Sequence, residues 1–490
     1  MIGGGIGGLA AAARLAAQGH QVTLFERAST VGGKVGRHER STPEGRFRFD
    51  TGPGLLTLPQ VFADLFAATG STLERELDLQ RLDPVVRHVF ADGAVLDSGS
   101  DPDAFQQRIA DALGRSAAAD WSTLWHRASR IFQASWHHVL SRPRPSPLDL
   151  AGLVWRLRDV VAIAPGRSLR GLGRAHLRDP RLRMLLERYA TYTGSDPRRA
   201  PAALAAIPYA ELTFGGWYPR GGFSTLADAL LGRCEALGVA VHTSSEVRRI
   251  DVHGGRISGV TLSTGDRHAA DLVVANADPV TVGRDLLGSR VHARAQRHAR
   301  AQSLAGFVLM LGVRGRTPGL AHHTVLFPAD YDAEFDAIFG RPARPADDPT
   351  LLVTVPDDPL VRPDGCEGWF VLANAPPHGH TDSTVDWRRP GLAETYADRL
   401  LDVLARRGFD VRERLLFREI RTPADLERDT ASPGGAIYGT VSHGLRGLLR
   451  PPNRGPVDGL YLVGGSTHPG GGLPMVALSA RIVADMIGRA

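Results

Sequence analysis

A glycine-rich turn at the start of the chain is the feature that most constrains its fold. Gly3, Gly5 and Gly8 fit the pattern G-x-G-x-x-G, and the alanine-rich residues 9–18 after them predict a helix that Gly19 ends. The first glycine allows a tight turn, the second lets the backbone approach a pyrophosphate, and the third lets the helix pack closely on a strand. The unpaired N–H groups and the dipole of such a helix N-terminus attract phosphate.

A strand with an acid at its end follows the helix. Residues 21–26 read as a buried strand, and its last residue, Glu26, lies 18 positions after Gly8. A carboxylate at about this spacing accepts hydrogen bonds from ribose hydroxyls and repels a 2′-phosphate. The helix, strand and acid together predict an α/β, Rossmann-type dinucleotide-binding domain, whereas the glycines alone would also fit a merely tight turn.

The strand expected before the glycine turn is almost missing. Only Met1 and Ile2 precede Gly3, whereas strands commonly have about five residues. We therefore expect the natural protein to begin upstream of Met1.

A second glycine motif follows the acid. Gly32, Gly33 and Lys34 precede Arg37, and the segment 49–53 contains Asp-Thr-Gly-Pro. Alone, a glycine pair is an ordinary turn, and NAD dehydrogenases do not need one here. With the first motif it resembles the FAD proteins of the amine-oxidase-like superfamily, in which the pair lies along the pyrophosphate and ribityl chain.

The C-terminal segment contains a second glycine-rich helix N-terminus. A predicted strand at 459–463 runs into Gly-Gly-Ser-Thr-His-Pro-Gly-Gly-Gly-Leu-Pro over residues 464–474, and a helix is predicted at 476–487. Pro474 suits its first turn. Because a reduced flavin carries negative charge at its N1–C2=O edge, a helix N-terminus aimed there would stabilise that charge.

This C-terminal segment is similar to the signature of the bacterial carotenoid (phytoene) desaturase family, and the resemblance covers nearly the whole chain. Within that family, residues 322–323 and 369–377 look most like enzymes that desaturate acyclic, often 1-hydroxylated carotenoids at the 3,4 position. The resemblance implies that FAD accepts a hydride at N5 from an allylic carbon and that loss of a vicinal proton forms a new C=C bond. It leaves the electron acceptor open between oxygen and a quinone.

Other functions on the same fold remain as alternatives. They are phytoene desaturation, a carotenoid or retinol saturase, an amine oxidase, and a prenyl-lipid carrier without flavin. The glycine loops at both chain ends argue against the carrier. Lys34, which is the only lysine, belongs to the second glycine motif and so does not supply the lysine contact expected of an amine oxidase.

The resemblance also assigns the candidate site residues. Val247 is expected to meet the adenine through its backbone, Asn276 and Ala277 to run beside the cofactor, and His468 to be the catalytic candidate closest to the flavin ring. A loop histidine satisfied by backbone is the alternative for His468. The expected cofactor-binding residues are Gly3, Gly5, Ile6, Gly8, Glu26, Gly32, Gly33, Lys34, Arg37, Gly52, Pro53, Val247, Asn276, Ala277, Gly465, Ser466, Gly472, Leu473, Pro474 and Met475.

We predict three regions in the chain. A discontinuous FAD-binding domain is expected at residues 1–70, 217–285 and 455–490, a helical region at 71–216 that binds substrate and faces a membrane, and a substrate domain with a mixed sheet at 286–454. Strands of that sheet are predicted at 306–313, 324–327, 350–355 and 369–373.

The helical region carries unusual charge and aromatic content. Residues 141–188 hold eleven arginines and four acids, and four of the seven tryptophans lie nearby, namely Trp121, Trp125, Trp136 and Trp155. Such a segment can lie on an anionic membrane, so we expect a cytoplasmic protein attached peripherally to the cytoplasmic membrane through residues such as Arg156, Arg158 and Arg170. A solvated arginine face over an ordinary core is the alternative.

The remaining composition excludes several classes. The net charge of +6 is modest for 490 residues, so no nucleic-acid partner is predicted. Cys234 and Cys366 form no CxxC pair, which fits a reducing compartment. The histidine pairs at 137–138 and 322–323 have no third ligand at a suitable spacing, so we expect no metal.

Overall fold

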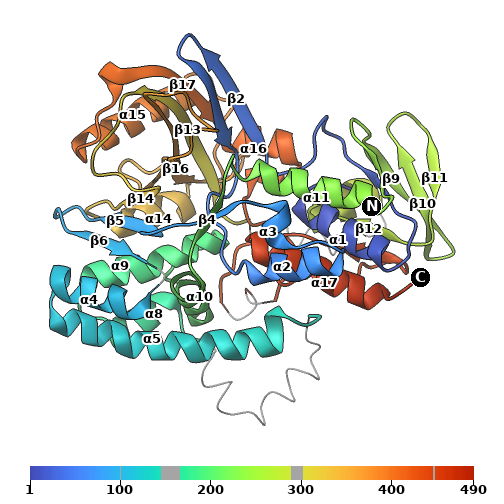
Figure 1. Ribbon diagram of the computed structural model, residues 1–490, viewed down its shortest axis with the longest axis horizontal. Coiled ribbons are helices and arrows are strands. Elements are labelled where there is room, and N and C mark those ends of the chain that lie inside the picture. Colours follow the sequence, from blue (N-terminus) through green and yellow to red (C-terminus); the bar gives the residue numbers. More distant parts are fainter. Residues whose placement is uncertain (100, 145–165, 289–301, 445–446, 448) are drawn as a thin grey trace.

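The computed structural model describes residues 1–99, 101–144, 166–288, 302–444, 447 and 449–490. Figure 1 shows three groups of elements: helices α1, α11 and α17 beside both chain termini on one side, a large sheet on the other, and a helical group below that sheet. The candidate site lies where these groups meet.

The domain with the glycine motifs is built on a parallel sheet whose central position is held by Ile2. Ile2 forms parallel bridges to Phe25 on one side and Ala275 on the other. The order is β8–β1–Ile2–β12–β18, and the outer pairs are parallel too. The bounds are Thr23–Phe25 (β1), Ala240–His242 (β8), Val273–Ala275 (β12) and Leu460–Leu462 (β18).

Helices cover this sheet and pack closely because the side chains at their contacts are small. In α1 (Ile6–Ala17) the four alanines at 10–13 are fully buried, and α1 packs against both α11 (Ser224–Ala236) and α17 (Leu473–Ile487). The helix predicted at 9–18 therefore begins three residues earlier, directly at the glycine turn. Two shorter helices lie in the same domain, α2 (Gln60–Ala68) and α3 (Leu73–Glu76).

Smaller strand groups flank this domain. One of them is an antiparallel sheet in the order β11–β10–β9, and its strand β9 begins at Val247, the residue expected to meet the adenine. Strands β2 and β3 form a separate hairpin. The bounds are Val247–His253 (β9), Arg256–Leu262 (β10), Arg267–Ala269 (β11), Arg37–Thr42 (β2) and Gly45–Asp50 (β3), with β4 (Leu79–Arg81) pairing with β7 (Trp217–Pro219) and the short helix α12 at Pro279–Thr281.

A seven-stranded mixed sheet forms the second large layer. Its order is β17–β13–β16–β15–β14–β5–β6, and only the pair β14–β5 is parallel. The bounds are Val86–Val89 (β5), Val95–Ser98 (β6), Ala305–Arg314 (β13), His323–Leu326 (β14), Leu351–Thr354 (β15), Cys366–Ala375 (β16) and Leu415–Arg421 (β17). These bounds confirm the four predicted strands. Strands β5 and β6 come from the part expected to be helical, so the sheet is wider than the sequence pattern indicated.

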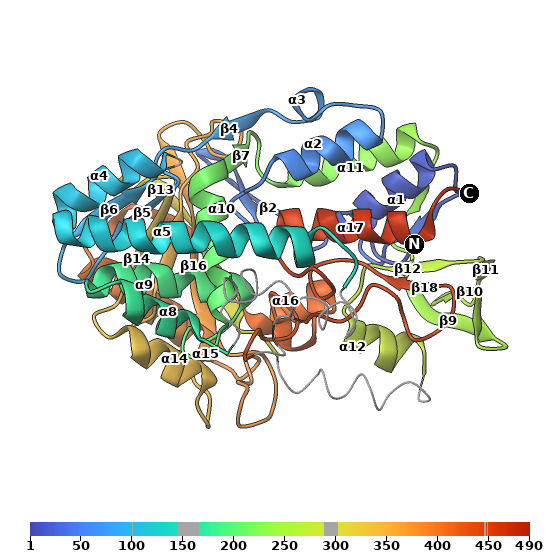
Figure 2. The same ribbon diagram turned by 90° about the horizontal axis from the view of Figure 1, so that it is seen from below.

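Helices border both sides of the seven-stranded sheet. Side chains of α15 (Leu392–Arg406) share a core with Phe307 and Trp369 of the sheet. The helical group packs around a separate core against β5 and β14, and Figure 2 shows α5 running along it. The bounds are Pro102–Leu113 (α4), Arg115–Ser135 (α5), Leu169–His176 (α8), Pro180–Arg188 (α9), Ala206–Phe214 (α10), Tyr331–Phe339 (α14) and Pro423–Thr430 (α16).

The sequence predicted a membrane-facing region from tryptophan and arginine side chains. Where the structure describes these side chains, Trp121 and Arg170 contact other residues of the protein. Trp121 is buried in the helical core and meets Phe105 edge-on, with ring centroids 5.3 Å apart. The Arg170 side chain is only 12% exposed, and its Nε donates a hydrogen bond to the Glu187 carboxylate at 2.9 Å. Arg156 and Arg158 lie outside the described residues. Membrane attachment stays a prediction, and no helix in the described ranges is long and apolar enough to cross a bilayer.

Candidate functional site

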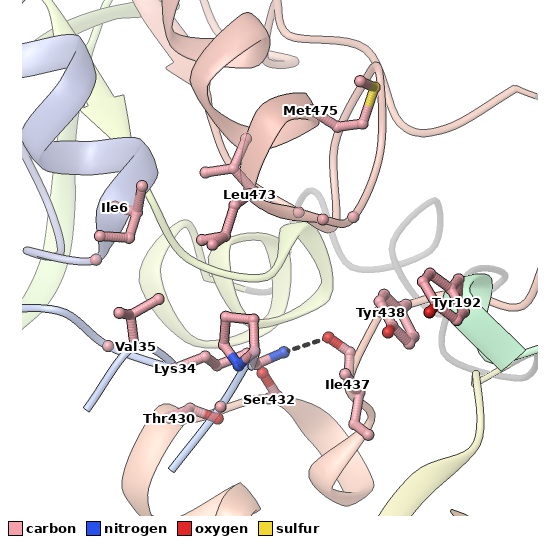
Figure 3. Close-up of a pocket in the computed structure, with 18 of the residues that line it drawn as sticks. Ile6, Lys34, Val35, Tyr192, Thr430, Ser432, Ile437, Tyr438, Leu473 and Met475 are labelled. Carbon is pink, nitrogen blue, oxygen red and sulfur yellow. Dashed lines mark hydrogen bonds between the residues drawn. The ribbon is translucent and has the colours of Figure 1, made fainter. Parts of the chain in front are cut away.

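A cavity of about 930 Å³ runs between the parallel-sheet domain, the seven-stranded sheet and the helical group. Its wall contains both glycine motifs and the start of α17. Figure 3 shows Ile6 and Val35 on one side of this space and Tyr192 and Tyr438 on the other. The glycine turn at residues 3–8 and the start of α17 therefore face one cavity, although they are more than 400 residues apart in the chain.

One end of the cavity is a helix N-terminus open to an anion. Gly5 is the N-cap of α1; no side chain caps this helix and no acid stands in its first turn. Gly5, Ile6 and Gly7 line the cavity, so the first N–H groups of α1 and its positive dipole end are available to a phosphate.

Glu26 fixes the geometry of this end. Its Oε2 accepts a hydrogen bond from the Gly4 N–H at 2.7 Å, and its Oε1 accepts one from the Ala28 N–H at 2.8 Å. The carboxylate is buried at the end of β1 and lines the cavity close to Val247. One acid thus ties the glycine turn to the following strand and places negative charge where the sequence predicts a ribose.

We expect Glu26→Gln to weaken FAD binding about 10- to 100-fold, because a charged acceptor of roughly 1.5–3 kcal/mol is lost and the new NH₂ group faces a backbone N–H. Titration of deflavinated protein with FAD measures this. Glu235→Gln is the matched control, since Glu235 is exposed on α11. Equal FAD affinity in Glu26→Gln and the parent would show that this carboxylate does not support the cofactor.

The second glycine motif crosses the segment 49–53 at very close range. A Cβ atom on Gly52 would lie 1.8 Å from the carbonyl oxygen of Lys34, so only glycine fits there. The Lys34 Nζ donates to the carbonyl oxygens of Ala436 at 3.0 Å and Ile437 at 2.8 Å, and Figure 3 shows the second of these bonds. Burial lowers the pKa of Lys34 to about 8, although Asp278 opposes the shift. Lys34 therefore holds the loop that carries Tyr438 against the cavity.

The start of α17 forms the opposite wall. Its N-cap, Gly472, offers no capping side chain, and Leu473, Pro474 and Met475 line the cavity. The Asn276 side chain donates to the Val463 carbonyl at 2.9 Å, which joins the ends of β12 and β18 beneath this helix start. A second positive helix end thus faces the same space as the first.

The inner end of the cavity is largely apolar. Side chains from α5, α10 and the seven-stranded sheet line it, including Phe132, Ile207, Val308, Leu352, Phe370 and Leu372. Tyr438 lies at the border between this end and the start of α17, and burial raises the pKa of its phenol to about 12. The phenol therefore stays protonated at neutral pH.

The structure brings eighteen of the twenty predicted cofactor residues to the cavity wall. They are Gly3, Gly5, Ile6, Glu26, Gly32, Gly33, Lys34, Gly52, Pro53, Val247, Asn276, Ala277, Gly465, Ser466, Gly472, Leu473, Pro474 and Met475. Of the other two, Gly8 packs on the backbone of Gly3. Arg37 points away, with a side chain 47% exposed and 3.8 Å from both Glu39 and Asp228.

His468 is not in the cavity wall. Its Nε2 lies 2.9 Å from the carbonyl oxygen of Arg142, and the ring is buried. Burial lowers the pKa of His468, which favours the neutral ring. This is the arrangement of a loop histidine satisfied by backbone, and a catalytic role for His468 rests on the sequence motif alone.

A buried polar cluster, of which Arg188 and Tyr192 line the cavity, was not found by sequence reasoning. It consists of Arg188 at the end of α9, Tyr189 and Tyr192 just after it, and Glu211 on α10. The one signal in the sequence was an acid inside the otherwise uncharged segment Ala206–Phe214. That signal does not tell which residues meet the acid.

Comparison with known proteins identifies the family. The model of the flavin-containing amine oxidoreductase family matches residues 6–359. The chain belongs to this family. It is 34% identical to 4,4′-diapolycopene oxygenase of Methylomonas over 99% of this chain and 97% of the relative, and 33% identical to carotenoid 3,4-desaturase of Haloarcula japonica with the same coverage. It is 35% identical to hydroxyneurosporene desaturase of Rhodobacter capsulatus, over 98% of this chain and 95% of that one.

Solved structures show the same fold at low sequence identity. A putrescine oxidase bound to putrescine matches with a TM-score of 0.61 at 16% identity over 99% of this chain and 98% of that chain. An oxidoreductase from Methanosarcina mazei matches with a TM-score of 0.62 at 19% identity over 99% of both chains. The amine-oxidase-like fold and the resemblance to carotenoid desaturases are confirmed.

FAD is the cofactor of this flavin-containing oxidoreductase, and the cavity fits it. The uncapped start of α1 and the Glu26 carboxylate suit the pyrophosphate and a ribose, and the uncapped start of α17 suits an electron-rich flavin edge. Gly32 and Gly33 present only backbone to the space between these two ends.

Proposed function

We propose that this protein is an FAD-dependent desaturase of an acyclic carotenoid, of the 1-hydroxycarotenoid 3,4-desaturase type. One observation carries the proposal: the cavity continues from the dinucleotide end past the start of α17 into a long apolar wall. That shape suits a polyene chain laid against a flavin. Relatives named as carotenoid desaturases, at 33–35% identity over nearly the whole chain, support the same reaction class.

Bound FAD supplies the hydride acceptor for the reaction. The residues of the chain contribute positioning and electrostatics. The positive end of α17 favours negative charge where the flavin edge would lie. Apolar side chains such as Ile207, Leu372 and Phe370 exclude water from the space where the polyene would lie.

The reaction also requires loss of a proton from the polyene. Tyr438 and Tyr192, which reach the cavity, have phenols whose pKa burial raises, to about 12 for Tyr438. They are therefore poor bases at neutral pH. A cation beside a conjugated polyene is delocalised and strongly acidic, so we propose that a weak base such as water accepts the proton.

Incubating the purified holoprotein with an acyclic 1-hydroxycarotenoid and a quinone tests the proposal. We expect a product lighter by two hydrogens, with absorption at longer wavelength because the conjugated system is extended. Deflavinated protein should be inactive, and added FAD should restore the activity. An unchanged substrate with fully FAD-loaded protein, under both oxygen and quinone, would contradict desaturation.

An oxygenation reaction is the outcome to watch for, because some relatives are named oxygenases at similar identity. A product that gains an oxygen atom while its conjugated chain keeps its length would replace the desaturase proposal by an oxygenase. The mass of the product decides between the two in one measurement.

A further inference from the structure

Asn374 is a polar residue at the end of an apolar row in the cavity wall. Phe370, Leu372 and Asn374 alternate along β16 and all three line the cavity, so their side chains share the face of the seven-stranded sheet that borders the proposed substrate space. Asn374 is the last of the three, because β16 ends at Ala375. An amide at this position adds a directional hydrogen-bonding group to a row of side chains that suits a hydrocarbon.

A buried carboxylate fixes the orientation of this amide. The Asn374 Nδ2 donates to the Oε1 of Glu334 at 2.7 Å, and Glu334, on α14, is only 1% exposed. The Oε2 of Glu334 accepts from the Thr350 N–H at 2.9 Å and from the Thr350 hydroxyl at 2.6 Å. Burial raises the pKa of Glu334, but these hydrogen bonds and the charge of Arg407 favour the ionised form. Because a carboxylate only accepts, the NH₂ group of Asn374 must face Glu334 and its Oδ1 must face elsewhere.

The Oδ1 of Asn374 is therefore an acceptor that the protein does not use. It has no hydrogen-bond partner in the described part of the chain, yet it is not sealed off, whereas the phenol oxygen of Tyr331 on α14 is buried without a partner. A polyene that displaces water from this part of the cavity would leave Oδ1 unpaired unless the polyene itself carries a donor. Among uncharged groups made of carbon, hydrogen and oxygen, that donor is a hydroxyl.

We propose that the Asn374 Oδ1 accepts a hydrogen bond from a hydroxyl group of the carotenoid, and that Glu334 is the positioning residue that aims the amide. The assignment rests on the proposed function for the polyene itself. A hydroxyl donates to Oδ1, whereas a carbonyl oxygen would face a second acceptor and a hydrocarbon would leave Oδ1 unpaired. The site thus selects hydroxylated chains over both ketones and hydrocarbons.

A competition between ligands on the holoprotein tests this selection. Three acyclic polyenes are compared that differ only at one carbon near the end, which bears a hydroxyl, a carbonyl oxygen or hydrogen. The flavin is reduced and oxygen is excluded, so that bound chains are not converted. The chains that leave detergent micelles and stay with the protein are quantified by chromatography. We expect the hydroxylated chain to bind about 10- to 100-fold more tightly than either of the others.

Glu334→Gln is the decisive variant because it should turn the Asn374 amide around. The Thr350 N–H still needs an acceptor, so the oxygen of the new side chain takes the place of Oε2 and its NH₂ group faces Asn374. Asn374 must then present Oδ1 to that NH₂ group and Nδ2 to the cavity. The carbonyl-bearing chain should gain about 10- to 100-fold in affinity over the hydrocarbon, while the hydroxylated chain, which also accepts, keeps its affinity. A purely structural Glu334 would not change which ligand is preferred.

Two further variants separate recognition from folding. Asn374→Leu removes the acceptor but leaves Glu334 its two hydrogen bonds from Thr350, and it should bring the three affinities close to one another. Glu367→Gln is the matched control. Glu367 is a buried carboxylate on the same strand that also accepts from a threonine N–H, a threonine hydroxyl and a side-chain N–H, but it does not line the cavity. It should keep the preference of the parent protein, and each ratio compares ligands on one protein, so a shared loss of stability cancels.

The outcomes also distinguish this proposal from the proposed function. Equal binding of the three chains by the parent protein overturns the selection, and so does a preference for hydroxyl over carbonyl that either Glu334→Gln or Asn374→Leu leaves intact. A parent protein that shows the expected preferences and variant effects, yet converts no chain when its FAD is oxidised, supports the selection and contradicts desaturation. Conversion of all three chains without any preference contradicts only the role of Asn374.

Discussion

Gly8→Ala is expected to yield protein without FAD and with severely reduced thermal stability. A Cβ atom on Gly8 would lie 2.0 Å from the carbonyl oxygen of Gly3 and 3.2 Å from the Cβ of Asn276. The first neighbour is backbone, so no side chain can turn away, and α1 would have to move off the central strand. We expect a loss at or above the upper end of the ~1–3 kcal/mol usual for overpacked cores. The displaced start of α1 would no longer meet the pyrophosphate.

Gly232→Ala is the matched control for this substitution. Gly232 also lies inside a helix, α11, but a Cβ atom there would meet no atom within 4 Å. Its stability should equal or exceed that of the parent, because alanine is favoured over glycine inside a helix by about 1 kcal/mol. FAD absorbance of the purified proteins and their melting temperatures report both effects. Full FAD content and an unchanged melting temperature in Gly8→Ala would disprove the close packing.

His88→Leu is expected to raise stability, and to raise it more in acid. His88 on β5 is fully buried, and both ring nitrogens lack a hydrogen-bond partner. Replacing these unpaired polar atoms by a side chain of similar size should gain about 1–3 kcal/mol at neutral pH. Burial, and secondarily the charge of Arg188, hold the pKa of His88 well below its usual range.

The pH dependence follows from that lowered pKa. The unfolded chain takes up a proton on His88 below its ordinary pKa of about 6.5, whereas the folded protein does not, so His88 destabilises the fold increasingly as the pH falls. Between pH 7 and pH 5 this difference grows by about 2 kcal/mol, so the advantage of His88→Leu should widen by that amount. His253→Leu, at an exposed strand end, should show no such widening. Parallel unfolding curves for His88→Leu and the parent at both pH values would rule out the explanation.

The sequence by itself determined the cofactor half of the site. Gly3, Gly5 and Gly8 form the turn and helix start they predicted, and the segments around Gly52 and Gly472 reach the same cavity. Such motifs are readable because each specifies a local backbone conformation or a close backbone approach that only glycine permits. The strands of the large sheet were likewise readable from short apolar runs such as 306–313.

The sequence interpretations of His468 and Arg170 depended on which residues lie nearby in space, and a sequence motif does not determine this. His468 lies within the glycine-rich segment, yet its ring turns to the Arg142 carbonyl instead of the cavity. Arg170 lies in a basic segment, yet it forms ion pairs with Glu187 and Asp332. A motif places a residue on a loop or a face, but the direction of its side chain depends on which distant element packs against it.

Only the tertiary structure decided how the substrate end is built. Strands β5 and β6 join the large sheet through β14, more than 200 residues away in the chain. Arg188, Tyr192 and Glu211 meet because the end of α9 and one side of α10 lie at the same wall of the cavity. No local pattern encodes this meeting, since each residue alone is compatible with an ordinary helix. Glycine turns constrain the backbone wherever they occur, whereas a buried cluster gains its chemistry only from partners that folding brings together.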